Sequence, residues 1–134
     1  MKPPQIIEPE SWARPLGYAN GVAASGRTLA IAGQIGWNPA TSKFESDDLV
    51  AQVTQALRNI VAVVRAAGGE PRHLVRLTWY LLDKSAYSEA RREIGRAYRE
   101  VMGDHYPAMS LVVVAGLLED RALVEIEGTA VLDS

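Results

Sequence analysis

Apolar positions along the 134-residue chain change their spacing several times, and each spacing predicts one type of element. After Asp47 the apolar residues recur every three or four positions, as they do on one face of an amphipathic helix. This stripe consists of Leu49, Val53, Leu57, Ile60, Val64 and Ala67. Ser46 is expected to cap the helix at its start, and Gly68-Gly69 to end it.

A second stripe predicts a second helix that ends near Gly103. Its members are Tyr87, Ala90, Ile94, Ala97 and Val101. Strands are expected at 73–83, 109–115 and 122–132, the last with strict alternation of apolar and polar residues. Residues 18–36 predict two strands joined as a hairpin by a turn at Ser25-Gly26.

The remaining segments are predicted to be less regular. Residues 1–17 hold four of the seven prolines and are expected to form an extended arm with one short strand at Gln5–Glu8. Residues 38–43 are expected to form a loop. The resulting order, β-β-α-β-α-β-β, predicts a single α+β domain over 1–134, with both helices on one face of a mixed sheet.

The strand at 109–115 presents apolar side chains on both of its faces. Met109, Leu111 and Val113 point one way, while Val112 and Val114 point the other. The two helices can cover only one of these faces. A second apolar face favours self-association, so we expect a homo-oligomer.

Composition removes several classes of site. The chain has no cysteine, which excludes disulfides, thiolate metal sites and a cysteine nucleophile. His73 and His105 lack metal-ligand spacing, so we expect no metal and no cofactor. There is no apolar run of membrane-spanning length and no signal-peptide pattern at the N-terminus, and we therefore expect a cytoplasmic protein with no membrane partner.

The formal net charge of −2 argues weakly against nucleic-acid binding. One local basic cluster exists in the second helix, formed by Arg91, Arg92, Arg96 and Arg99. It can be interpreted as an RNA-binding face or as a solvated helix face with acids at pairing distance. No aromatic residue is interleaved with these arginines as a base-stacking platform, which favours the solvated face.

Several short motifs occur in an order that is typical of one family. They are Gly17-Tyr18, "AGQIGWNPAT", "Q-x-x-x-A-L-x-N-I" at 52–60, "AAG" at 66–68, "VRLTWYLLD", "YPAMS" and "VEIEGTAV". The ordered set covers nearly the whole chain and resembles the RidA/YjgF family, also labelled L-PSP endoribonuclease.

The resemblance implies a chorismate-mutase-like fold and a homotrimer whose sheets form a central β-barrel with the helices outside. It also implies small-molecule sites in clefts between subunits. The activity it implies is hydrolysis of reactive enamines and imines, such as 2-aminoacrylate, to a ketoacid and ammonia.

Three positions depart from the deaminating members. The arginine that holds the substrate carboxylate in those members is replaced by Met109. A guanidinium makes two charge-assisted hydrogen bonds to a carboxylate, and a thioether makes none, a loss of about 1.5–3 kcal/mol. The serine of "S-G-Q" is Ala32, and an asparagine of the second helix aligns with Arg91.

Other site positions are retained. Tyr18 matches the tyrosine at the cleft, and Gly33 can offer its backbone N–H to an anion or a carbonyl oxygen. Glu125 matches the glutamate that positions the attacking water, with Glu127 as the fallback. Trp37 or Trp79 is a candidate aromatic wall, although both are also compatible with the core.

The sequence therefore leaves two functions open. The first is a metabolite-binding trimer that hydrolyses an enamine or imine less anionic than 2-aminoacrylate, with Met109 lining an apolar pocket. The second is a ligand-binding or protein-interaction trimer that has lost catalysis, in which Met109 only fills space. RNA cleavage is disfavoured.

Overall fold

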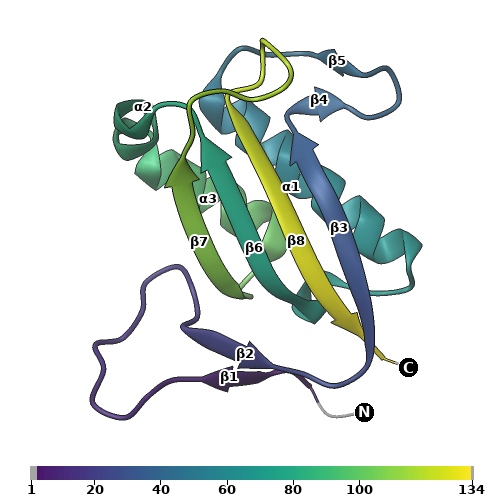
Figure 1. Ribbon diagram of the computed structural model, residues 1–134, viewed down its shortest axis with the longest axis vertical. Coiled ribbons are helices and arrows are strands. Elements are labelled where there is room, and N and C mark those ends of the chain that lie inside the picture. The colour runs from purple at the N-terminus through teal and green to yellow at the C-terminus, as the bar shows by residue number, and fades with distance from the viewer. Residues whose placement is uncertain (1–2, 134) are drawn as a thin grey trace.

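The computed structural model describes residues 3–133 and centres on a mixed four-stranded sheet (Figure 1). Its strands are β3 (Arg27–Ile35), β8 (Val124–Leu132), β6 (Leu74–Leu81) and β7 (Ala108–Val113), in that spatial order. The pairs β3–β8 and β8–β6 are antiparallel, and β6–β7 is parallel. The predicted mixed sheet is confirmed, with β3 and β7 at its two edges.

Helices α1 (Leu49–Ala66) and α3 (Arg91–Met102) cover one face of this sheet, as predicted (Figure 1). Side chains of α1, β6 and β8 pack together in the core between the helices and the sheet, and Leu57, Leu77 and Ile126 are fully buried. Each such side chain contributes about 1.5–3 kcal/mol by leaving water. The short helix α2 (Lys84–Glu89) and the 3-10 turn Pro71–His73 connect these elements.

Two helix boundaries differ from the expectation. The N-cap of α1 is Asp48, not Ser46, because the Asp48 carboxylate accepts a hydrogen bond from the Ala51 N–H at 3.0 Å. The Ser46 hydroxyl instead accepts from the Asp48 N–H. The predicted second helix is divided into α2 and α3 at Ala90, which caps both. An Asp83 cap starts α2 three residues before the apolar stripe begins.

The predicted hairpin at Ser25-Gly26 is wrong. Strand β2 (Gly21–Ala23) pairs with β1 (Gln5–Ile7) in a separate two-stranded sheet, whereas β3 pairs with β8. Three residues of β2 offer few hydrogen bonds, while β8 offers nine residues with matching alternation. The 38–43 region is a turn between the short strands β4 (Trp37–Asn38) and β5 (Lys43–Phe44).

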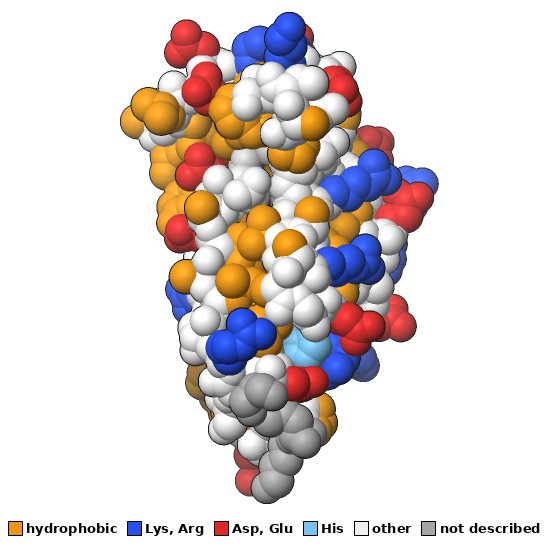
Figure 2. Space-filling model, turned by 90° about the vertical axis from the view of Figure 1, so that its right-hand side faces the viewer, with side chains coloured by type: hydrophobic (Ala, Val, Ile, Leu, Met, Phe, Trp, Pro, Cys, Tyr) orange, Lys and Arg blue, Asp and Glu red, His pale blue; other side chains and the backbone are white. Residues whose placement is uncertain are grey.

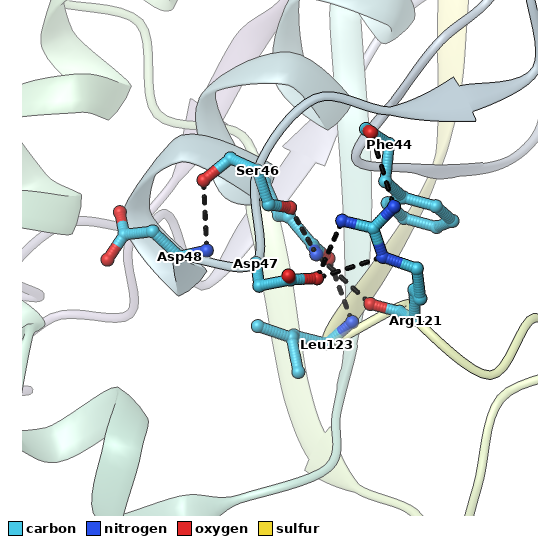
Figure 3. Close-up of polar contacts among 7 residues, drawn as sticks. Phe44, Ser46, Asp47, Asp48, Arg121 and Leu123 are labelled. Atoms are coloured by element: carbon cyan, nitrogen blue, oxygen red, sulfur yellow. Dashed lines mark hydrogen bonds and ion pairs between the residues drawn. The ribbon is translucent and has the colours of Figure 1, made fainter.

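The buried face of α1 carries two polar side chains that hold loops in place. Gln52 is fully buried, donates from Nε2 to the carbonyls of Ser46 and Arg121, and accepts from the Leu123 N–H. Asn59 donates to the carbonyls of Ile35 and Trp37. Figure 3 shows Ser46, Arg121 and Leu123 gathered at this point, with Arg121 also bonded to Asp47.

Strand β7 is an edge strand with apolar side chains in contact with solvent. Leu111, Val112 and Val113 are 39%, 42% and 54% exposed, so both of its faces are open in one copy of the chain. On the side of the molecule shown in Figure 2, basic and acidic side chains are interspersed instead of gathering in one basic patch. Within residues 3–133, no helix is both long enough and apolar enough to cross a membrane.

Candidate functional site

A pocket of about 460 Å³ lies between the N-terminal arm, the start of β7 and helix α3. Three of the predicted binding residues, Tyr18, Arg91 and Met109, line it together. No acidic side chain is among the lining residues, and most of the wall is apolar or aromatic.

Tyr18 reaches the pocket because the arm is fastened to the start of β7. The Ala19 N–H donates to the Pro107 carbonyl at 3.0 Å, and Ala19 forms a parallel bridge with Ala108. Gly17 has a φ of +78°, in the left-handed region that favours glycine, and this turn directs the chain into the bridge. Tyr18 remains 42% exposed beside Met109.

The inner wall is aromatic. Tyr98 and Tyr106 stack with ring centroids 5.1 Å apart, and the Tyr98 hydroxyl donates to the His105 carbonyl at 2.7 Å. Burial raises the pKa of Tyr98, so its hydroxyl stays neutral. Trp79 also lines the pocket, and its buried indole N–H has no partner among residues 3–133. Of the two candidate tryptophans, Trp79 is on this wall, whereas Trp37 packs against Phe44 elsewhere.

The other predicted residues, Ala32, Gly33 and Glu125, form a second group at the opposite edge of the sheet. A bulge in β3 between Ile31 and Gln34 exposes Ala32 and Gly33. The Glu125 side chain folds over Gly33, because a Cβ placed on Gly33 would lie 2.5 Å from the carboxylate Oε2. Only glycine leaves room for this carboxylate in its present position.

Glu125 and its fallback Glu127 are in different environments. Glu127 accepts a short hydrogen bond from the Tyr80 hydroxyl, and this bond raises the pKa of Tyr80. Glu125 has no hydrogen-bond partner among the described residues, so its oxygens are free to bind water. This difference favours Glu125 over Glu127 as a water-binding carboxylate.

Within one copy the two groups do not meet. Met109 is on β7 and points to the helix side, in register with the buried Leu77. Glu125 alternates with the buried Val124 and Ile126 and therefore points to the opposite face. In the order β3-β8-β6-β7, Gly33 on β3 is three strand spacings from β7, about 14 Å, and Glu125 on β8 is two spacings away, about 10 Å.

Gly95 and Arg99 are among the pocket residues that were not singled out from the sequence as binding residues. Gly95 and Arg99 line the same wall as Arg91, one and two turns further along α3. The spacing of i, i+4 and i+8 is the signal that could have found them. In the sequence, Arg99 stands out only as part of a charged helix surface. Within residues 3–133, no group of three or more His, Asp or Glu side chains is placed to hold a metal ion.

Comparison with known proteins identifies the family and the fold. The family model described as "Endoribonuclease L-PSP" matches residues 11–132. A RutC family protein of Pyrococcus horikoshii is 32% identical over 126 residues, which cover 94% of this chain and 96% of that protein. The chain belongs to the RidA/YjgF family.

Two further members of the RidA/YjgF family bear on the fold and the activity. A Rid family protein of unknown function from Yersinia pestis has a solved structure with a TM-score of 0.86 and 35% identity, covering 98% of this chain and 100% of that one. The 2-iminobutanoate/2-iminopropanoate deaminase of Dermatophagoides farinae is 29% identical over 133 residues, 99% of this chain and all of that protein.

Proposed function

We propose that copies of this chain assemble into a closed ring in which the pocket of one copy meets the Gly33–Glu125 pair of the next. The supporting observation is that Met109 lies on one edge strand, whereas Gly33 lies on the other edge strand, and Glu125, on the strand beside it, points to the opposite face. A head-to-tail contact between unlike edges repeats until the ring closes. The family resemblance sets the number of copies at three.

The exposed edge strand β7 supplies the apolar surface for this contact. Leu111 and Val113 are exposed on one face and Val112 on the other face of a strand that has a free hydrogen-bonding edge. Such an edge is normally paired or covered in a folded protein. We expect Val113→Glu to dissociate the ring in light scattering, and Ala62→Glu, an exposed change on α1, to leave it intact. A Val113→Glu protein of unchanged mass would contradict the ring.

We propose hydrolysis of an imine or enamine as the reaction of the joint cleft. Glu125 takes a proton from water as the oxygen attacks the carbon of the C=N bond. The nitrogen then gains protons and leaves as ammonia, and a carbonyl remains. The Gly33 N–H is available to an oxygen atom that develops negative charge. Relatives named 2-iminobutanoate/2-iminopropanoate deaminase support this class of reaction.

Met109 distinguishes this cleft from that of the deaminating members. Its thioether gives β7 an apolar surface at the position where those members place an arginine. The substrate is therefore either less anionic than 2-aminoacrylate or has its anionic group held by another wall. The same replacement, together with Ala32, favours the second candidate function, a ligand-binding trimer without catalysis.

The test is decay of 2-iminopropionate generated in situ, together with a bulkier imine derived from leucine. We expect wild type to accelerate decay of at least one imine and Glu125→Gln to lower the rate about 10²–10⁴-fold. Glu127→Gln, on the same strand and face, is the matched control and should retain activity. If wild type accelerates neither imine, the non-catalytic function is supported. If Glu127→Gln removes activity and Glu125→Gln does not, the assignment of the carboxylate is wrong.

A further inference from the structure

Helix α3 presents two arginines to the pocket with a glycine between them. Arg91, Gly95 and Arg99 are spaced by four residues and all line the pocket. Among residues 3–133, neither guanidinium has a carboxylate within 4.0 Å, since the ion pairs present involve Arg72, His73 and Arg121. The pocket therefore has two positive charges on one wall and no acidic residue to balance them.

Gly95 is an unusual residue for the middle of a helix, because glycine is the least favourable residue there after proline. Its position explains the arrangement of the arginines. A Cβ on Gly95 would lie 3.5 Å from Arg99 Nη1, so the Arg99 guanidinium folds back over the glycine. Helical side chains lean towards the N-terminus, and this direction brings Arg99 towards Arg91. The glycine lets the Arg99 guanidinium lie close to the helix backbone, on the same wall as Arg91.

The sheet side of the same pocket has the opposite character. Met109 and Leu111 come from β7, and Trp79 and the stacked Tyr106 complete an apolar, aromatic surface. A ligand that fits both walls needs an anionic group at one end and an apolar or aromatic body at the other. Arginine suits a planar carboxylate because its donors match both oxygens.

We infer that Arg91 and Arg99 hold the carboxylate of an apolar-bodied ligand, and that Met109 packs against its body. The inference rests on the proposed function, and it assigns the substrate to the imines of bulky apolar or aromatic carboxylic acids. The charge that family members place on β7 is supplied here by α3. The substrate is anionic, and its carboxylate lies against the helix wall instead of the sheet wall.

The probes are 3-phenylpropanoate and its neutral amide, 3-phenylpropanamide, titrated calorimetrically into the full-length protein. We expect wild type to bind the carboxylate at least tenfold more tightly than the amide. Arg91→Gln and Arg99→Gln should each weaken carboxylate binding about tenfold and leave amide binding unchanged. Arg96→Gln, on the same helix but outside this pocket, is the matched control and should change neither probe by more than about twofold.

Equal binding of the two probes to wild type would overturn the inference, and so would full carboxylate affinity in both arginine variants. Met109→Ala should weaken both probes alike, because both share the apolar body. These binding results are independent of turnover: Glu125→Gln can abolish imine hydrolysis without changing the preference for the carboxylate. Failure of the proposed reaction and failure of this inference are therefore distinguishable.

Discussion

Replacing Gln52 with leucine should destabilise the protein by several kcal/mol, although leucine is similar in volume. Gln52 is fully buried and makes three hydrogen bonds of 2.9–3.0 Å to Ser46, Arg121 and Leu123. Each bond contributes about 1 kcal/mol, and a buried group left without a partner costs about 1–3 kcal/mol. We expect the free energy of unfolding to fall by about 3–5 kcal/mol, a large share of the 5–15 kcal/mol that is typical of a domain.

Urea denaturation at a fixed protein concentration measures this loss. With an m-value of about 2 kcal/mol/M, the midpoint should move down by about 1.5–2.5 M. Gln55→Leu is the matched control, because Gln55 is on the same helix and makes a single side-chain bond to Asn59 at 2.8 Å. We expect a loss of about 1 kcal/mol or less there. The reasoning is refuted if Gln52→Leu is no more destabilising than Gln55→Leu.

Three further predictions concern the site. Gly33→Ala should displace the Glu125 carboxylate by about 1 Å, because the new Cβ would lie 2.5 Å from Oε2, well below van der Waals contact. We expect this to lower imine hydrolysis about 100-fold with little change in the urea midpoint. In a Glu125→Gln background the same substitution should have no further effect on the rate. Gly95→Ala should raise the free energy of unfolding by about 0.4–1 kcal/mol by thermal denaturation, because the added Cβ is in ordinary contact with Arg99, and it should weaken binding of 3-phenylpropanoate. Burial raises the pKa of Tyr98, so the stabilisation that comes from its neutral hydroxyl is complete below pH 10 and is lost as the pH rises above 10. Tyr98→Phe should reduce this alkaline loss of stability, measured by urea denaturation between pH 9 and 11.

The regular elements of the fold could be predicted because their patterns are long. The stripe of α1 and the alternation of β8 each extend over nine or more residues, and tertiary packing follows the same pattern. The Ser25-Gly26 hairpin could not be predicted correctly, because a turn signal says nothing about which strands pair. The cap at Asp48 was missed for a similar reason, since Ser46 and Asp48 are both good caps and only the geometry selects one.

Candidate site residues could be named from the sequence, but their arrangement could not. Tyr18, Arg91 and Met109 were placed by family resemblance, and the structure brings them to one pocket. Local spacing could not indicate that Gly33 lies on the far edge strand with Glu125 on the strand beside it, because that separation from β7 arises from the strand order β3-β8-β6-β7. Gly95 carries no chemistry of its own, so only its contact with the Arg99 guanidinium shows that it matters.

The wall that holds the carboxylate also decides where the reacting carbon lies. In a 2-imino acid the carboxylate and the C=N carbon are adjacent, so moving the anion from β7 to α3 moves the reacting carbon with it. In the proposed ring, Glu125 of the neighbouring copy must then meet that carbon near the helix wall, or the anion and the C=N bond must be separated by a spacer within the substrate. A displacement of about 1 Å is enough to cost about 100-fold in rate. Substrates with the carboxylate one or two methylenes from the imine carbon should therefore differ sharply in turnover even where their affinities are similar, and Arg91→Gln should reduce this discrimination.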